Sequence, residues 1–542
     1  MIIERQLKEA IQKAFLELNQ DISLDQIVIE RSKEKIHGDF ATNVAMQMAR
    51  VLKKAPKVIA EDLKNRIKLD AIEKMEVAGP GFLNFFIRQE SLNSLIEEIV
   101  LKGDLYGSSN YGKGIRINVE YVSANPTGDL HLGHTRGAAL GDSICRLYKF
   151  IGYDVTREFY VNDAGNQILN LAKSINVRYH EALGDNSLDF PDDGYHGEDV
   201  KVIATRISKE VGDKYLHNEE EAFNYFRIRG TELELEKLKK DLSDFRVEFD
   251  VFSSELAIRN KGEVEEVLNT LKDYLYVQDG ATFLKTSEFG DDKDRVVIKS
   301  DGTYTYLLPD IAYHQNKLRR NFAFLIDCLG ADHHGYISRM KAALQMLGYK
   351  EDVLDIELIQ MVRLFKDGKE YKMSKRTGNA ISMRELCEEV GVDAVRYFFV
   401  SRAASSHLDF DLDLATKMES SNPVFYAQYA HARLAKVLKL GKDYDIDLKG
   451  KLLNEEVEKK LLKVLEQFPK EVENSALNRA PYKLTNYIQK LATVIHEFYT
   501  MCRIIDENNK ERSASRLGLS KAAKQVMKNA LGLIGVEAPE EM

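Results

Sequence analysis

Two histidines three residues apart, His131 and His134, are of a residue type that can donate hydrogen bonds to phosphoryl oxygens. They follow a stretch over 115–128 that alternates like a strand and then turns. A helix start rich in small residues comes next, over 136–142. Backbone N–H groups and the positive end of a helix dipole attract anions, and Gly133 allows close approach. The pattern predicts a phosphate-binding loop, although a lone histidine pair of this kind is also typical of a surface turn.

A second segment with phosphate chemistry lies far downstream, where Lys372 and Lys375 flank Met373 and Ser374. Lysines three apart beside Ser, Thr, Gly and Asn favour a mobile loop that folds over a polyphosphate, and the alternative is a solvated basic loop. Either segment alone is moderately specific. The ordered pair, H-x-G-H followed by K-M-S-K, is highly specific.

Composition bounds the remaining possibilities. The chain has 542 residues with 44% hydrophobic and 30% charged, which predicts three or four domains. We expect a cytoplasmic protein, because no apolar run has membrane-spanning length and the N-terminus does not read as a signal peptide. The net charge of −9 argues against an indiscriminate polyanion binder, yet 416–542 holds 21 Lys and Arg against 17 Asp and Glu. The cysteines lack the spacing of a zinc site: Cys145, Cys328, Cys387 and Cys502.

Hydrophobic patterns divide the chain. Residues 1–110 predict an α+β module, and the glycine-rich segment 102–114 predicts a linker. The charged region 175–295 predicts a helical insertion of no evident function. An apolar strand over 322–329 ends in G-A-D-H-H-G-Y, and the ends of such strands form ligand sites in open α/β sheets. Most of the rest predicts helices, including an apolar stripe from Tyr482 to Cys502 that indicates core packing.

Five segments in order resemble the arginyl-tRNA synthetases, which are class I aminoacyl-tRNA synthetases. They are D-F-A-T-N from Asp39, V-S-A-N-P-T-G-D-L-H-L-G-H from Val122, Y-V-N-D-A-G-N-Q-I from Tyr160, G-A-D-H-H-G-Y from Gly330 and N-P-V-F-Y-A-Q-Y-A-H-A-R from Asn422. The resemblance implies a multidomain α/β fold with a Rossmann-type parallel-sheet catalytic domain. It implies a tRNA-elbow domain over 1–110, the catalytic domain over 111–415 with its insertion over about 175–295, and an all-α anticodon-binding bundle over 416–542.

The resemblance also implies roles for individual residues. His131, His134, Lys372 and Lys375 would be catalytic. Arginine would be bound at its amino and carboxylate end by Glu120 and Asn125, at its guanidinium by Tyr306 and Asp310, and at the pocket wall by His333. The implied ATP-binding residues are Ala124, Asn125, Pro126, Thr127, Gly128, Asp129, Leu130, His131, Leu132, Gly133, His134, Lys372, Met373, Ser374 and Lys375. The implied tRNA-binding residues are Asn43, Tyr426, Tyr429, Arg433 and Tyr487. For each of the last four, packing in the core of the bundle is the open alternative.

The implied reaction consumes ATP with Mg²⁺, arginine and tRNA(Arg), in a protein that is a monomer by family habit and carries no structural zinc. His333 and His334 have no partner ligands at a suitable spacing, so no protein metal site is expected. Two other readings stay open. One is a nucleotidylyltransferase with the same H-x-G-H fold and a small acceptor, and the other is a non-catalytic relative that only binds tRNA.

Overall fold

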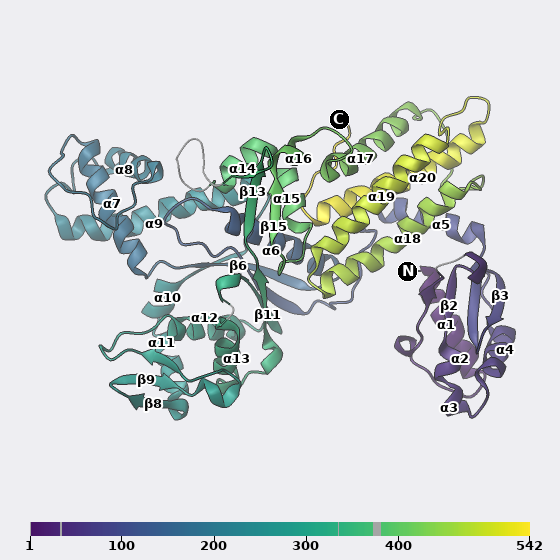
Figure 1. Ribbon diagram of the computed structural model, residues 1–542, viewed down its shortest axis with the longest axis horizontal. Coiled ribbons are helices and arrows are strands. Elements are labelled where there is room, and N and C mark those ends of the chain that lie inside the picture. Colours follow the sequence, from purple (N-terminus) through teal and green to yellow (C-terminus); the bar gives the residue numbers. More distant parts are fainter. Residues whose placement is uncertain (1, 33–34, 334, 372–380) are drawn as a thin grey trace.

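The computed structural model describes residues 2–32, 35–333, 335–371 and 381–542, and Figure 1 shows their arrangement. The N-terminal unit has a four-stranded antiparallel sheet in the order β1-β2-β4-β3, packed against helices. Its elements are α1 (Ile2–Leu16), β1 (Glu30–Arg31), β2 (Phe40–Thr42), α2 (Val44–Gln47), α3 (Ala49–Leu52), α4 (Pro56–Arg66), β3 (Ile72–Ala78) and β4 (Phe82–Ile87).

The hydrophobic core of this unit ends at Ile87, before the predicted linker 102–114. The next helix, α5 (Gln89–Lys102), packs on α18 (Glu456–Leu477) and α20 (Lys510–Leu533) of the C-terminal bundle. The predicted module 1–110 is therefore divided, because the apolar residues Ile96 and Ile99 of α5 are buried in a different core.

A five-stranded parallel sheet forms the centre of the molecule, in the order β12-β11-β5-β6-β7. The chain starts at β5 and adds strands to one side before it returns to add β11 and β12 on the other. Ligands bind in such sheets where the order reverses, at the carboxyl ends of the strands. The predicted parallel-sheet α/β fold is confirmed. The strands are β5 (Arg116–Glu120), β6 (Asp154–Val161), β7 (Val251–Ser254), β11 (Phe324–Gly330) and β12 (Leu354–Ile359).

The prediction of a helical insertion over 175–295 is wrong in part. β7 lies within that range, pairs with β6 and completes the central sheet. A small antiparallel sheet, β10-β9-β8, also falls mostly inside it. These strands have only four residues each, too few for an alternating pattern to stand out beside charged helices. Their bounds are β8 (Leu275–Gln278), β9 (Ala281–Leu284) and β10 (Arg295–Ile298).

Helices surround the central sheet, and a third small sheet, β14-β13-β15, lies beside it. The helices are α6 (Leu132–Phe150), α7 (Asn166–Ala182), α8 (Glu198–Val211), α9 (Glu219–Asp244), α10 (Glu255–Asn260), α11 (Glu263–Thr270), α12 (Leu307–Arg319), α13 (Tyr336–Met346), α14 (Met383–Val390), α15 (Val392–Val400) and α16 (Leu412–Thr416). The small strands are β13 (Val362–Lys366), β14 (Lys369–Glu370) and β15 (Leu408–Asp411).

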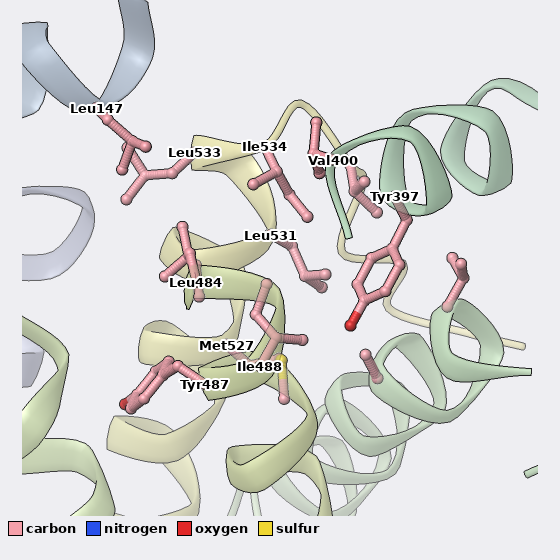
Figure 2. Packing of buried hydrophobic residues seen from close by; sticks show 14 of the residues in the cluster. Leu147, Tyr397, Val400, Leu484, Tyr487, Ile488, Met527, Leu531, Leu533 and Ile534 are labelled. Atoms are coloured by element: carbon pink, nitrogen blue, oxygen red, sulfur yellow. The ribbon is translucent and has the colours of Figure 1, made fainter. Parts of the chain in front are cut away.

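The C-terminal bundle consists of α17 (Pro423–Leu440), α18, α19 (Pro481–Met501) and α20. The predicted apolar stripe lies on α19, where Leu484, Tyr487 and Ile488 are buried in the core that α19 shares with α18 and α20. Figure 2 shows that this packing extends to Tyr397 of α15 on one side and, through Leu533, to Leu147 of α6 on the other. In the described ranges, no helix is both long and apolar enough to span a membrane.

Polar contacts reinforce this junction between the catalytic sheet and the bundle. The buried Arg396 of α15 forms an ion pair with Asp142 of α6. Its guanidinium also donates to the carbonyl oxygens of Phe245 and Ile534, each at 3.0 Å. Ile534 directly follows α20, so a single side chain joins α6, α15 and the end of the bundle.

Candidate active site

His131 is the N-cap of α6, and its ring stacks on that of His134 with 3.7 Å between ring centroids. The His131 Nδ1 accepts hydrogen bonds from the backbone N–H groups of Gly133 and His134, at 3.1 and 3.5 Å. The His134 Nδ1 accepts from the His131 backbone N–H at 3.3 Å. The structure thus shows the helix cap. Capping uses only one nitrogen of each ring, so it is compatible with the predicted phosphate contacts.

Both histidines are held neutral. Burial lowers the pKa of His131, and burial together with the neighbouring ring lowers that of His134 to about 3. Since each Nδ1 accepts a hydrogen bond, the proton of each neutral ring is on Nε2. α6 thus starts with the two side-chain N–H donors of His131 and His134, in addition to the backbone N–H donors of its first turn. This set of donors suits the binding of an anion.

The loop between β5 and α6 has an unusual backbone. Val122 and Ser123 have φ of +68° and +41°, a region that β-branched residues rarely adopt. The Ser123 hydroxyl donates to Glu120 at 2.8 Å and accepts from the Tyr160 backbone N–H at 3.1 Å, which ties the ends of β5 and β6 together. Strained residues of this kind persist only where the surroundings hold them, and they cluster at functional sites.

The predicted ATP-binding residues 124–130 continue this loop. The Asn125 amide donates to Gln167 of α7 at 2.6 Å. Asp129 forms an ion pair with Lys237 of α9 at 2.8 Å, so the helical part of 175–295 contacts the loop directly. Ala124 and Leu130 are buried and anchor the loop in the core. No feature of the sequence predicted that Lys237 contacts this loop.

Lys372, Met373, Ser374 and Lys375 lie outside the described residues. The chain resumes beside the histidines. Ser382 forms an isolated antiparallel bridge with His131, and the backbone N–H of Met383 donates to the Leu130 carbonyl at 2.7 Å. The basic segment is therefore followed within the chain by residues in contact with the predicted phosphate loop.

The predicted arginine-binding residues lie near the carboxyl ends of β5 and β11. Asp310 is in the first turn of α12, with 30% of its side chain exposed. Tyr306 immediately precedes α12 and is 77% exposed, while His333 is exposed after β11. Glu120 is only 6% exposed and forms an ion pair with Lys317. Its carboxylate is therefore already engaged inside the protein.

Sequence reasoning missed a buried polar network behind Asp310. Lys317 of α12 contacts both Glu120 of β5 and, at 2.9 Å, Asp327 of β11. His314, one turn earlier, contacts the other oxygen of Asp327 at 2.7 Å. The sequence did contain a sign of this network, because His314 and Lys317 share a face of a helix whose neighbouring positions are apolar. Metal-ligand groups of three or more His, Cys, Asp or Glu are not found among the residues described.

The residues predicted to contact RNA differ in how exposed they are. Tyr487 is 3% exposed and its hydroxyl donates to the Val464 carbonyl at 3.0 Å, so the prediction that it stacks on RNA is wrong. Arg433 is partly exposed, with its guanidinium 4.5 Å from the ring centroid of Tyr429. Tyr426 is partly exposed beside these residues and packs on His496, 4.4 Å between centroids.

Beside Tyr429 and Arg433 lies an open groove of about 950 Å³. Three lysines and two glutamates line it: Lys436, Lys439, Lys524, Glu540 and Glu541. In the N-terminal unit, Asn43 directly precedes α2 and its amide oxygen accepts from Gln47 at 2.9 Å.

Comparison with known families and proteins gives a consistent result along the whole chain. Residues 1–87 match the arginyl tRNA synthetase N terminal domain, 95–404 the class I (R) tRNA synthetase catalytic domain, and 427–542 the DALR anticodon binding domain. The arginine–tRNA ligase of Bacillus subtilis is 51% identical, and that of Anoxybacillus flavithermus 50%, over all of this chain and 98% of each relative.

Solved structures agree. A chain from Campylobacter jejuni is 35% identical with a TM-score of 0.78, covering 84% of this chain and all of that one. The arginyl-tRNA synthetase of Thermus thermophilus, 22% identical, shares the fold with a TM-score of 0.75 over 99% of this chain and all of its own. With three matching domains in order, the parallel sheet and the histidine pair at the start of α6, the chain belongs to the arginine–tRNA ligase family of class I aminoacyl-tRNA synthetases.

Proposed function

We propose that this chain activates arginine with ATP and transfers it to the 3′ end of tRNA(Arg), releasing AMP and pyrophosphate. The observation that carries the proposal is the pair of Nε2–H donors at the start of α6, beside the carboxyl end of β5. The names of the full-length relatives support it. The proposal assigns the N-terminal unit, whose core ends at Ile87, to the tRNA elbow, 111–415 to catalysis and 416–542 to the anticodon.

In the first step, an oxygen of the arginine carboxylate attacks the α-phosphorus of MgATP in line. The bond from the α-phosphorus to the bridging oxygen breaks, and pyrophosphate leaves. His131 and His134 donate to phosphoryl oxygens as charge builds there, and no protein side chain forms a covalent bond, so catalysis is positioning and charge stabilisation. Lys372 and Lys375 neutralise the β- and γ-phosphates in this scheme, a role that rests on the resemblance alone.

In the second step, a hydroxyl of the terminal adenosine of tRNA attacks the arginyl carbonyl carbon. The bond from that carbon to the phosphate oxygen breaks, AMP leaves, and the hydroxyl proton is released. Backbone donors of the first turn of α6 are near the phosphate that departs.

Arginine is selected by its guanidinium. A planar fork of N–H donors is best met by a carboxylate, and Asp310 offers one that is partly exposed at the reversal point of the sheet. Burial and the nearby Asp310 carboxylate hold the pKa of the Tyr336 phenol well above its usual value, so Tyr336 stays a donor to Asp310. Tyr306 and His333 line the same end of the sheet in this proposal, and Asn125 holds the substrate carboxylate.

tRNA binds across the C-terminal bundle, with Tyr429 and Arg433 presenting a ring and a guanidinium for unpaired bases, and with Asn43 at the elbow. The groove beside them includes Arg433 and Lys436 besides the pairs Lys439–Glu541 and Lys524–Glu540. These two cations support contact with a polyanion. We place the activity in the cytoplasm and in a monomer, as the family resemblance implies, and gel filtration with light scattering tests the second point.

Amino-acid-dependent pyrophosphate exchange, with and without tRNA, tests the proposal. Only arginine should support exchange, and we expect tRNA to be required. His134→Ala should lower kcat by about 10²- to 10³-fold, since it removes one donor to a developing oxyanion. His217→Ala, which changes an exposed histidine of the insertion, is the matched control. Exchange by the His134 variant at the wild-type rate would refute the assignment. Exchange without any amino acid would favour the nucleotidylyltransferase, and tRNA binding without exchange would favour the non-catalytic relative.

A further inference from the structure

His314 lies in the middle of α12 with 2% of its side chain exposed, and neither ring nitrogen faces solvent. Nε2 contacts Asp327 Oδ2 at 2.7 Å. Nδ1 contacts the Asp310 carbonyl oxygen at 2.8 Å and approaches its Oδ1 to 3.5 Å. All three partners are acceptors, so both ring nitrogens carry protons. Burial disfavours this charge, but Asp327 outweighs it and raises the pKa of His314 to about 10.

Asp327, the inner partner, is itself fixed. It is 2% exposed on β11, between His314 and Lys317, and these two cations hold the pKa of its carboxyl below the usual range despite burial. Lys317 in turn reaches Glu120 on β5. The imidazolium is therefore attached to the central sheet on one side and to Asp310 on the other.

Asp310, the outer partner, is the residue that the proposed function places against the substrate. Its side chain is the only one of the Asp327–His314–Asp310 series with substantial exposure, 30% against 2% for each of the others. Among the described residues, Tyr336 is a hydrogen-bond partner of its carboxylate. His314 donates to the backbone carbonyl of Asp310 at 2.8 Å and approaches one carboxylate oxygen to 3.5 Å. The two side chains together therefore limit how the carboxylate can turn.

We propose that His314 is a positioning residue for arginine recognition, which holds Asp310 in the plane that a guanidinium fork requires and is itself held by Asp327. The inference rests on the proposed function and deepens it, since His314 does not touch substrate. A carboxylate free to rotate still attracts any cation, whereas a fixed one favours the planar, two-pronged guanidinium over the ammonium of lysine. His314 thereby contributes to discrimination as well as to affinity.

Two substitutions separate positioning from plain structural support. The amide nitrogen of an asparagine side chain falls close to the place of Nδ1, and that of glutamine close to the place of Nε2. His314→Asn should keep the contact with Asp310, and His314→Gln should keep only the contact with Asp327. We expect the KM for arginine to rise by about 10- to 100-fold in His314→Gln, the scale of a misplaced binding group, and by about fivefold at most in His314→Asn. The KM for ATP should change by about twofold at most in both, and the preference for arginine over lysine should fall in His314→Gln.

The matched control is His431→Gln. His431 is also fully buried, and its Nδ1 contacts the Pro539 carbonyl at 2.8 Å in the C-terminal bundle. Its arginine KM should equal that of the wild type. The inference is overturned if His314→Gln has the wild-type arginine KM, or if both His314 variants lose kcat alone in proportion to lost folded protein.

A measurement on the unaltered protein removes any dependence on how the variants fold. In ¹⁵N-histidine-labelled wild type, one ring with both nitrogens protonated well above neutral pH identifies His314. Its Nδ1 resonance should move when arginine saturates the site, and should stay in place with citrulline, the neutral urea analogue of arginine. An Nδ1 resonance unaffected by arginine overturns the inference. If wild type shows no arginine-dependent exchange at all, the proposed function fails instead.

Discussion

Lys317→Met tests the most heavily charged part of the buried site. The Lys317 ammonium is fully buried between Glu120 and Asp327, which come from neighbouring strands of the sheet. Methionine keeps much of the length and apolar body of lysine but removes its charge. Two carboxylates then share an apolar setting, with His314 as the remaining cation.

The expected cost is that of breaking a buried pair, about 3–5 kcal/mol at pH 8. Unfolding entropy is about 2.1 cal/mol/K per residue, or about 0.6 kcal/mol/K for the roughly 300 residues of the catalytic region. The melting temperature of this region should therefore fall by about 5–8 °C. Lys463→Met is the control, because Lys463 pairs with Asp39 at a partly exposed site where a pair is worth at most about 1 kcal/mol.

The pH dependence has a definite sign. Burial already raises the pKa of Glu120, while Lys317 opposes the rise, and Lys317 helps to hold that of Asp327 low. Removing the ammonium raises both pKa values in the folded state. A carboxyl whose folded pKa is raised contributes stability at low pH that is lost as pH increases through that pKa. The difference in melting temperature between wild type and Lys317→Met should thus be larger at pH 8 than at pH 5.5.

Differential scanning calorimetry at the two pH values measures these shifts. A decrease no larger than that of Lys463→Met, or a difference that widens toward pH 5.5, would contradict the account of the buried site.

Two further predictions concern the bundle and the strained loop. Tyr487→Phe should lower the unfolding free energy by about 1 kcal/mol, because it loses the hydrogen bond to Val464, and should leave the KM for tRNA unchanged. Arg433→Ala should raise the KM for tRNA by about tenfold or more. Equal KM changes for the two variants in aminoacylation assays would contradict the argument that Tyr487 is buried. Val122→Gly should change stability by only about 1 kcal/mol in denaturant unfolding, because relief of about 1–3 kcal/mol of backbone strain offsets the lost side chain. The same variant should raise the KM for ATP by about threefold to tenfold, and a wild-type value would show that the strained turn does not hold the phosphate loop.

Local patterns were sufficient for some of these features. The strand, turn and helix start around His131 are decided by residues close in sequence, and the structure places them as predicted. The stripe on α19 was also correctly predicted to be buried, because helical periodicity reports which face is apolar. The error at Tyr487 came from treating an aromatic residue of the bundle as a stacking surface for RNA bases, although the same periodicity placed it in the core.

The remaining features depend on pairings that sequence does not display. Lys317 meets Glu120 only because β5 and β11 become neighbours in the sheet. β7 has too few residues to show a strand pattern in the sequence. Only its pairing with β6 identifies it as part of the sheet. α5 reads as a continuation of the N-terminal module until its buried face is seen against the bundle.

The link that Arg396 makes between Asp142 and Ile534 has a consequence for how the molecule can move. The helix that begins with His131 and His134 is joined, near its middle, to the end of the C-terminal bundle that meets the catalytic domain. Rotation of the bundle against the catalytic domain at this joint would have to break a buried ion pair, which opposes such a movement. In the proposed function, this joint sets the distance between the anticodon-binding bundle and the site where arginine is activated.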